Sequence, residues 1–109
     1  MKVFLTGATG VLGRAAARAL LEAGHWLRPA WSRSRESCSD QDRLAAAFAG
    51  HDAVCNLATH APVGAAALRR RFWREGDRIR TEGARNAAAA ARAADVRQLV
   101  QESVSLVYA

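Results

Sequence analysis

Residues 2–13 read KVFLTGATGVLG and place three glycines directly after a short apolar run. The Val, Phe and Leu of this run are typical of a buried strand. Gly7, Gly10 and Gly13 follow at intervals of three, and glycine lacks the Cβ atom that would hold another group away from the backbone. The stretch therefore predicts a strand over residues 2–6 and then a loop that something approaches closely.

The remaining sequence alternates between helix-like and strand-like segments. Periodic Leu and Ala residues predict a helix from about Val11 that ends at Gly24, and Asp40 is a candidate N-cap for a short helix with Leu44, Ala45, Phe48 and Ala49 on one face, closed by Gly50. A longer helix is expected within Phe72–Ala94, with Ile79, Gly83, Ala87, Ala90 and Ala94 on its inner face. Further strands are expected at Leu27–Trp31, Asp52–Ala58 and Arg97–Glu102. Such alternation predicts an α/β fold, a parallel sheet with helices on both faces.

Length and composition limit the class of protein. A chain of 109 residues, half of them hydrophobic but only 6% aromatic, fits one globular domain with a modest core. Cys38 and Cys55 are too few and too differently placed for a disulfide scaffold or a metal site. No apolar leader or stretch of about 18 apolar residues is present. We therefore expect a cytoplasmic protein with no membrane partner.

The net charge of +6 comes almost wholly from arginine. No helix-turn-helix, zinc-finger or RNA-binding signature accompanies it, so we expect no nucleic-acid partner. The histidines, His25, His51 and His60, lie on different predicted elements without the Cys, Asp or Glu spacing of a metal site, and no metal is expected.

The spacing of the glycines separates two kinds of phosphate loop. A nucleoside-triphosphate loop needs glycines five apart followed by Lys and Ser or Thr, but Leu12 stands five after Gly7. A dinucleotide loop needs a tight turn, close approach of the pyrophosphate, and close packing of the helix on the sheet. Gly7, Gly10 and Gly13 can serve these purposes in turn. A turn of purely structural use is the alternative.

Three segments in order resemble one family. TGATGVLG (6–13), AGHDAVCNLATHAP (49–62) and RTEGARNAAAAARAADVRQLVQES (80–103) are similar to the extended and atypical short-chain dehydrogenase/reductases, the NAD(P)-dependent epimerase/dehydratase group. The resemblance implies a Rossmann-like fold and a dinucleotide cofactor. It also implies that the parent enzyme performs oxidoreduction, epimerisation or dehydration on a small-molecule substrate.

The resemblance also implies which residues bind the cofactor. Gly7, Thr9, Gly10, Val11, Leu12 and Gly13 would line the pyrophosphate, while Leu57, Ala58 and Thr59 would lie beside the nicotinamide ribose, unless they are ordinary strand-end packing. Ser32 and Arg33 follow the second strand, and no acidic residue occurs from His25 to Arg35. This favours NADP over NAD, because a basic residue here accepts a 2′-phosphate. Arg33 is the leading candidate, with a solvated surface arginine as the alternative.

The chain departs from the family in one strand. Family members usually place another helix and a third strand before the segment that matches DQDRLAAAFAG (40–50), but only residues 34–39 fill that interval. We therefore expect about four strands in the family order 2-1-4-5, with the third missing and the second at the edge. Pro29 suits an edge if its nitrogen faces outward.

The catalytic pair of the family is also missing. The family uses Tyr-x-x-x-Lys, but Tyr108 and Lys2 are the sole residues of their types. Ser103 is the candidate for the substrate-side serine, although a shifted register would put Val104 there.

We therefore expect residues 1–109 to form a single NAD(P)-binding domain, truncated before the catalytic and substrate-binding part and inactive alone. A homodimer through the 72–94 helix is possible. A non-catalytic NADP-binding sensor and a non-functional truncated gene product are the alternatives.

Overall fold

The computed structural model describes residues 1–30, 41–57 and 79–102. Its strands are β1 (Lys2–Thr6), β2 (Trp26–Ala30), β3 (Ala53–Asn56) and β4 (Gln98–Gln101). Its helices are α1 (Val11–Glu22), α2 (Gln41–Phe48) and α4 (Ala84–Ala93), with a π-helical turn, η3 (Ile79–Gly83), leading into α4. The predicted strands and helices are thus present, within a few residues of their predicted bounds where the structure describes them.

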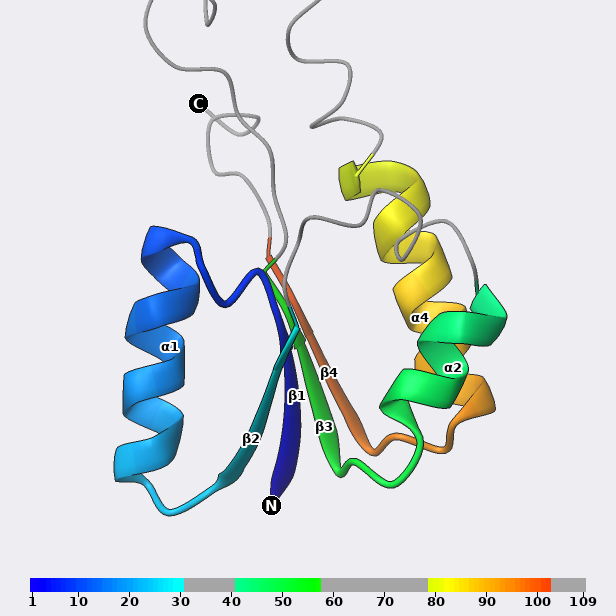
Figure 1. The fold of residues 1–109 in the computed structure, drawn as a ribbon. Coiled ribbons are helices and arrows are strands. Elements are labelled where there is room, and N and C mark those ends of the chain that lie inside the picture. The colour runs from blue at the N-terminus through cyan, green and yellow to red at the C-terminus, as the bar shows by residue number, and fades with distance from the viewer. Residues whose placement is uncertain (31–40, 58–78, 103–109) are drawn as a thin grey trace, which may run out of the picture.

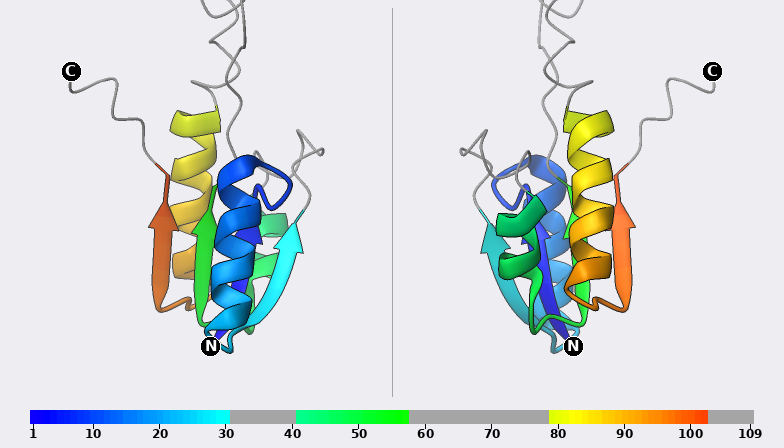
Figure 2. Two further views of the ribbon diagram at one scale, coloured as in Figure 1. Left: turned by 90° about the vertical axis from the view of Figure 1, so that its left-hand side faces the viewer. Right: turned by 90° about the vertical axis from the view of Figure 1, so that its right-hand side faces the viewer.

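The four strands form one parallel sheet in the order β2-β1-β3-β4. Helix α1 covers one face, and α2 and α4 lie together on the other (Figures 1 and 2). The predicted Rossmann-like fold, its strand order and its helices on both faces are therefore confirmed. The carboxyl ends of all four strands point to the same edge of the sheet.

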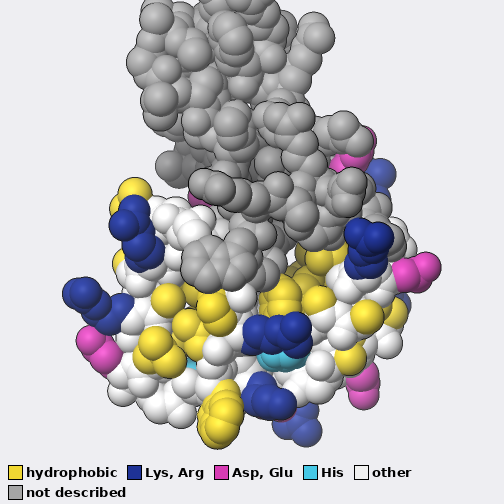
Figure 3. All heavy atoms as spheres, in the orientation of Figure 1, with side chains coloured by type: hydrophobic (Ala, Val, Ile, Leu, Met, Phe, Trp, Pro, Cys, Tyr) yellow, Lys and Arg dark blue, Asp and Glu magenta, His cyan; other side chains and the backbone are white. Residues whose placement is uncertain are grey.

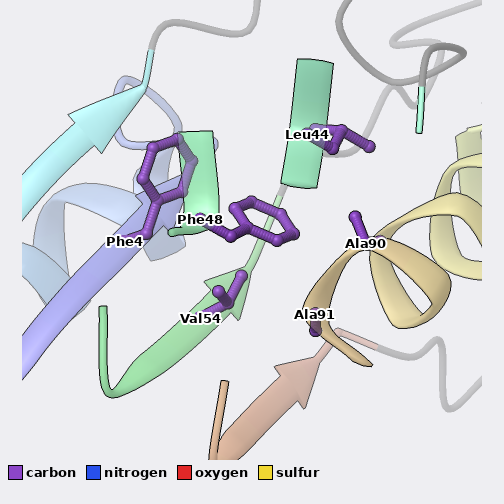
Figure 4. Packing of buried hydrophobic residues seen from close by; sticks show 7 residues of the cluster. Phe4, Leu44, Phe48, Val54, Ala90 and Ala91 are labelled. Atoms are coloured by element: carbon purple, nitrogen blue, oxygen red, sulfur yellow. The ribbon is translucent and has the colours of Figure 1, made fainter. Parts of the chain in front are cut away.

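The core on the α2 and α4 side is built from two aromatic rings and small side chains. Phe4 and Phe48 meet edge to face with ring centroids 5.1 Å apart. The cluster around them comprises Leu44, Val54, Ala87, Ala90 and Ala91 (Figure 4). The small alanine side chains of α4 let the two helices approach closely.

Some boundaries differ from the prediction. Ala49 was expected on the inner face of the short helix, but α2 ends at Phe48 and Ala49 is exposed. Strand β3 begins one residue after the predicted Asp52, whose carboxylate accepts a 2.8 Å hydrogen bond from the Lys2 N–H, and it ends before Leu57. The predicted end at Ala58 lies outside the described residues. Gly24 and Gly50 end their helices as predicted, with φ angles of +84° and +80°.

Strand β2 stands at one end of the sheet order, and Pro29 fits that position. The Trp26 N–H donates to the Met1 carbonyl, toward β1. Because N–H groups alternate in direction along a strand, the nitrogen of Pro29, three residues on, faces away from β1. Proline therefore removes no hydrogen bond between β1 and β2. The sequence also predicts that the third strand of the family is missing. That prediction concerns the interval at residues 34–39, which lies outside the described residues.

The surface carries charges of both signs. Lys and Arg side chains are distributed over the face seen in Figure 3, with acidic side chains among them. Within the described ranges no helix is long and apolar enough to cross a bilayer. No group of three His, Cys, Asp or Glu side chains in those ranges could hold a metal ion.

Candidate functional site

The glycine loop joins the carboxyl end of β1 to the first turn of α1 (Figure 1). The Gly10 N–H donates to the Gly7 carbonyl at 3.1 Å, which closes the turn. The Arg14 N–H then donates to the Gly10 carbonyl at 2.9 Å and begins the helix. The loop is thus fixed at both ends by the backbone.

Gly7 supplies the turn. Its φ of +71° lies in the left-handed region, which L side chains rarely adopt, so a glycine is favoured by the backbone conformation alone.

Gly13 supplies close packing. A Cβ atom on this buried residue would lie 1.9 Å from the Gly7 carbonyl oxygen and 2.9 Å from the Ala8 α-carbon. Both contacts are with backbone, which cannot rotate away as a side chain can. The first turn of α1 therefore lies against the loop only because residue 13 has no side chain.

Gly10 differs from both. Its φ of −72° and ψ of 170° are extended values open to any residue. Among the described residues, only the Gly7 carbonyl oxygen, at 3.4 Å, comes within 4 Å of a Cβ added here. That distance is an ordinary contact, so neither conformation nor packing within the described chain requires a glycine. Its bare backbone therefore leaves room for a group that the described residues do not supply.

The start of α1 is chemically suited to an anion. Gly10 is the N-cap and has no side chain to accept a hydrogen bond from the first N–H groups, and the first turn has no acidic residue. The positive end of the helix dipole therefore meets no negative charge from its own first turn. Val11 and Leu12 follow directly and are 85% and 53% exposed. A bound group reaching this turn would meet N–H donors and apolar surface together.

The second predicted group of site residues is described in part. Leu57 follows β3, and its N–H donates to the Thr6 carbonyl at 3.3 Å, which brings it beside the end of β1. Of the remaining predicted site residues, Thr9 lies exposed in the glycine loop. Those outside the described ranges are Ser32, Arg33, Ala58, Thr59 and Ser103.

A row of polar side chains at the same edge was missed by sequence reasoning. The Thr6 hydroxyl donates to Asn56 Oδ1, and Asn56 Nδ2 donates to Gln101 Oε1 at 2.8 Å. These residues are direct neighbours across β1, β3 and β4. The sequence signal was an asparagine inside an apolar run, although its two partners depend on strand register.

The described cysteine and histidines have structural surroundings. Burial raises the pKa of the Cys55 thiol, which favours the protonated form over the nucleophilic thiolate. His51 Nδ1 lies 3.2 Å from the Phe48 carbonyl, and its ring meets Phe4 edge on. His25 Nδ1 lies 3.1 Å from the Met1 amino group. The two histidines precede β2 and β3, at the edge of the sheet opposite the glycine loop.

Comparison with known proteins identifies the family. The sequence model of the NAD dependent epimerase/dehydratase family matches residues 3–109. The chain belongs to this family. Its sequence is 33% identical over 114 residues to an L-arabinose 1-dehydrogenase (NAD(P)(+)) of Haloferax volcanii, covering 98% of this chain and 42% of that one. The resemblance seen in the three sequence segments is therefore confirmed.

Solved structures show the same fold. A short-chain dehydrogenase/reductase superfamily protein of Agrobacterium tumefaciens with bound NAD is 29% identical with a TM-score of 0.73, covering 99% of this chain and 34% of that one. A UDP-glucose 4-epimerase of Stenotrophomonas maltophila with bound NAD and formylated UDP-arabinopyranose is 23% identical with a TM-score of 0.80, covering 99% and 38%. This chain spans less than half the length of each of these relatives.

Proposed function

We propose that this chain is the NAD(P)-binding portion of a short-chain dehydrogenase/reductase-type protein and holds the pyrophosphate of the cofactor on the glycine loop. The observation that carries the proposal is the contrast between Gly13, where the chain's own backbone forbids a side chain, and Gly10, where it does not. A glycine without a reason inside the described chain, at an uncapped helix start, has a reason if an anionic ligand lies against it.

The three glycines then divide the requirements of a dinucleotide loop among them. Gly7 makes the turn, Gly10 admits the pyrophosphate to the backbone, and Gly13 lets α1 pack on the strand end. The alternative of a purely structural turn explains the first and third but leaves Gly10 unexplained. Val11 and Leu12 would contribute backbone N–H groups, and Leu57 would lie toward the nicotinamide ribose.

The cofactor preference is proposed to be NADP, with Arg33 as the residue that accepts the 2′-phosphate. Support comes from sequence: no acidic residue that would bind ribose hydroxyls occurs from His25 to Arg35. The named relatives cover both possibilities, since one uses NAD(P)(+) and two are seen with NAD.

The substrate class proposed for the parent protein is a sugar or sugar nucleotide. The Haloferax volcanii relative is named for L-arabinose, and the Stenotrophomonas maltophila protein holds a UDP-pentose derivative. We propose that residues 1–109 bind cofactor without turning over such a substrate. The one lysine begins β1, at the edge of the sheet opposite the glycine loop, so it cannot assist a tyrosine at the cofactor.

The test is titration with NADPH and NADH, followed by nucleotide fluorescence and by calorimetry. Gly10→Val should abolish binding, because its branched side chain would occupy the phosphate position. Ala19→Val, on an exposed part of α1 two turns away, introduces the same side chain and should bind as the unaltered chain does. Equal binding by the Gly10 variant and the unaltered chain would contradict the assignment of the loop.

A further inference from the structure

The amino end of strand β2 carries an exposed indole ring. Trp26 is the first residue of β2, and 76% of its surface is exposed. A tryptophan side chain has a large apolar area, and its burial normally stabilises a fold. The described part of this fold gains little from the ring, so its exposure directs attention to what surrounds it.

Two basic side chains lie on the same face of the sheet. In the parallel register of β1 with β2, Trp26 is the partner of Lys2. Two residues further along, Arg28 is the partner of Phe4. Because side chains alternate between the two faces along a strand, all four are on one face, the one on which Phe4 joins the core. Lys2, Trp26 and Arg28 are exposed there, and we call these three residues the β1–β2 surface.

The helices of that face leave the β1–β2 surface open. The core cluster beneath α2 and α4 includes Phe4 and Val54 but, within the described ranges, no residue of β2. Figure 3 shows basic side chains around an apolar one at the end of the sheet where β1 and β2 begin, with no acidic side chain among them. The Asp52 carboxylate, which is close to Lys2, already accepts the backbone N–H of that residue.

Arg28 is held over an aromatic ring. Its guanidinium carbon lies 5.9 Å from the centre of the Phe4 ring, where the face of the ring attracts a cation. The Phe4 ring is itself in edge-to-face contact with Phe48 and His51. A guanidinium over a ring keeps its planar set of N–H donors for a further partner, because the ring face takes none of them. The surface therefore combines a positioned cation with an open indole.

We propose that the β1–β2 surface binds single-stranded nucleic acid, at a site separate from the glycine loop. Unpaired bases stack on aromatic side chains that a sheet presents, and neighbouring Lys and Arg side chains meet the phosphates. The net charge of +6 adds a general attraction for a polyanion. An acidic peptide would satisfy the two cations, but its carboxylates offer the indole no flat ring on which to stack.

This inference differs from the expectation, drawn from the sequence, that nucleic acid is not a partner. That expectation depends on the absence of a sequence signature. Lys2 and Trp26 belong to different strands and become neighbours only through the register of β1 with β2, so no signature in the sequence could show them together.

The β1–β2 surface and the glycine loop lie at different ends of β1. Lys2 begins this strand of five residues, and the loop follows its carboxyl end. Five residues of strand span about 16 Å, at about 3.3 Å each. A short oligonucleotide on the surface and a dinucleotide on the loop could therefore be bound together.

The test is titration of fluorescein-labelled decamers of deoxythymidine and of uridine with the unaltered chain, followed by fluorescence anisotropy between about 50 and about 200 mM salt. Trp26→Ala removes the stacking ring, and Lys2→Gln and Arg28→Gln each remove one cation. Arg18→Gln is the matched control, because Arg18 is exposed on α1, which covers the other face of the sheet. Circular dichroism checks that each variant folds.

Trp26→Ala should weaken binding about tenfold, through loss of base stacking, and should leave its salt dependence unchanged. Lys2→Gln and Arg28→Gln should each make the slope of log affinity against log salt shallower by about 0.7, the value for one phosphate contact of a single strand. Arg18→Gln should change neither the affinity nor the slope by a comparable amount. NADPH should not displace the decamers.

The proposal is overturned if neither decamer binds the unaltered chain in a salt-dependent way, or if Trp26→Ala and Lys2→Gln leave the binding unchanged. Displacement of the decamers by NADPH would also overturn it, because both ligands would then share the glycine loop. A polyglutamate peptide that binds as tightly as the decamers, and as tightly to Trp26→Ala, would identify a surface for acidic polypeptides instead. Should Arg28→Gln not fold, Lys2→Gln decides the salt dependence alone, since the Lys2 side chain is exposed.

Discussion

The carbonyl oxygen of Gly7 lies so close to the α-carbon of Gly13 that a Cβ atom there would stand only 1.9 Å from it. This contact joins the end of β1 to the first turn of α1. It means that two of the three glycines serve the loop's own structure, so that the third can be tested for binding alone.

Gly13→Ala should therefore destabilise the fold, while Gly10→Ala should not. The added methyl group at residue 13 must displace backbone, which we expect to cost about 3 kcal/mol. At residue 10 it meets one ordinary contact, and the free energy of unfolding should stay within about 1 kcal/mol of the unaltered chain. Urea unfolding followed by circular dichroism measures both. Equal stabilities of the two variants would contradict the packing argument.

The sequence suggested a tight turn at Gly7 and close packing at Gly13, and the structure shows the physical basis of each. The sequence showed three equally spaced glycines after a strand, which was enough to predict β1, α1 and the loop between them. Their separate purposes depend on the φ of Gly7 and on the approach of Gly13 to the loop, which follow from the assembled turn. The regular spacing of the glycines identifies the loop in the sequence, whereas the contacts of each glycine in the folded chain give its physical role.

The polar row could not be predicted for a related reason. Asn56 was visible as a polar residue in an apolar run, but Thr6 and Gln101 are 50 and 45 residues away from it in sequence. They become neighbours only once the parallel register of β1, β3 and β4 is set. The strand order itself was predictable, because alternation of strand and helix and the family resemblance allow few arrangements.

The Cys55 thiol should lower the stability of the fold at alkaline pH. Burial raises its pKa in the folded chain, so the unfolded chain loses this proton first as pH rises. The free energy of unfolding should then fall above about pH 8.5, the ordinary thiol value, and Cys55→Ala should lack this part of the decline. Urea unfolding at pH 7 and pH 10, with Cys38→Ser in both chains, makes the comparison. A steeper decline in Cys55→Ala would contradict the direction of the shift.

Arg33→Asp should narrow or reverse the preference for NADP over NAD. An aspartate at this place would repel a 2′-phosphate and accept hydrogen bonds from ribose hydroxyls instead. The measurement is the ratio of the two dissociation constants in the variant and the unaltered chain. An unchanged ratio would mean that Arg33 does not recognise the 2′-phosphate, and Arg35→Asp would then be the next variant to measure.

The chain should show no dehydrogenase, epimerase or dehydratase turnover. A positioned general acid or base contributes about 10²–10⁴ in rate, and residues 1–109 contain no Tyr-x-x-x-Lys pair to supply one. NADPH absorbance should stay at background over a panel of sugars, sugar nucleotides, ketones and aldehydes. Reproducible turnover that disappears in Tyr108→Phe would show that this tyrosine is catalytic after all.

The most direct test of the central claim, that the glycine loop holds a dinucleotide, is amide NMR mapping of the unaltered chain during titration with NADPH. The account predicts that the amide signals of Gly10, Val11, Leu12 and Gly13 move together and saturate. The signals of Gly24 and Gly50, which follow the carboxyl ends of α1 and α2, should stay in place. Saturable binding that leaves the four loop signals unmoved would contradict it.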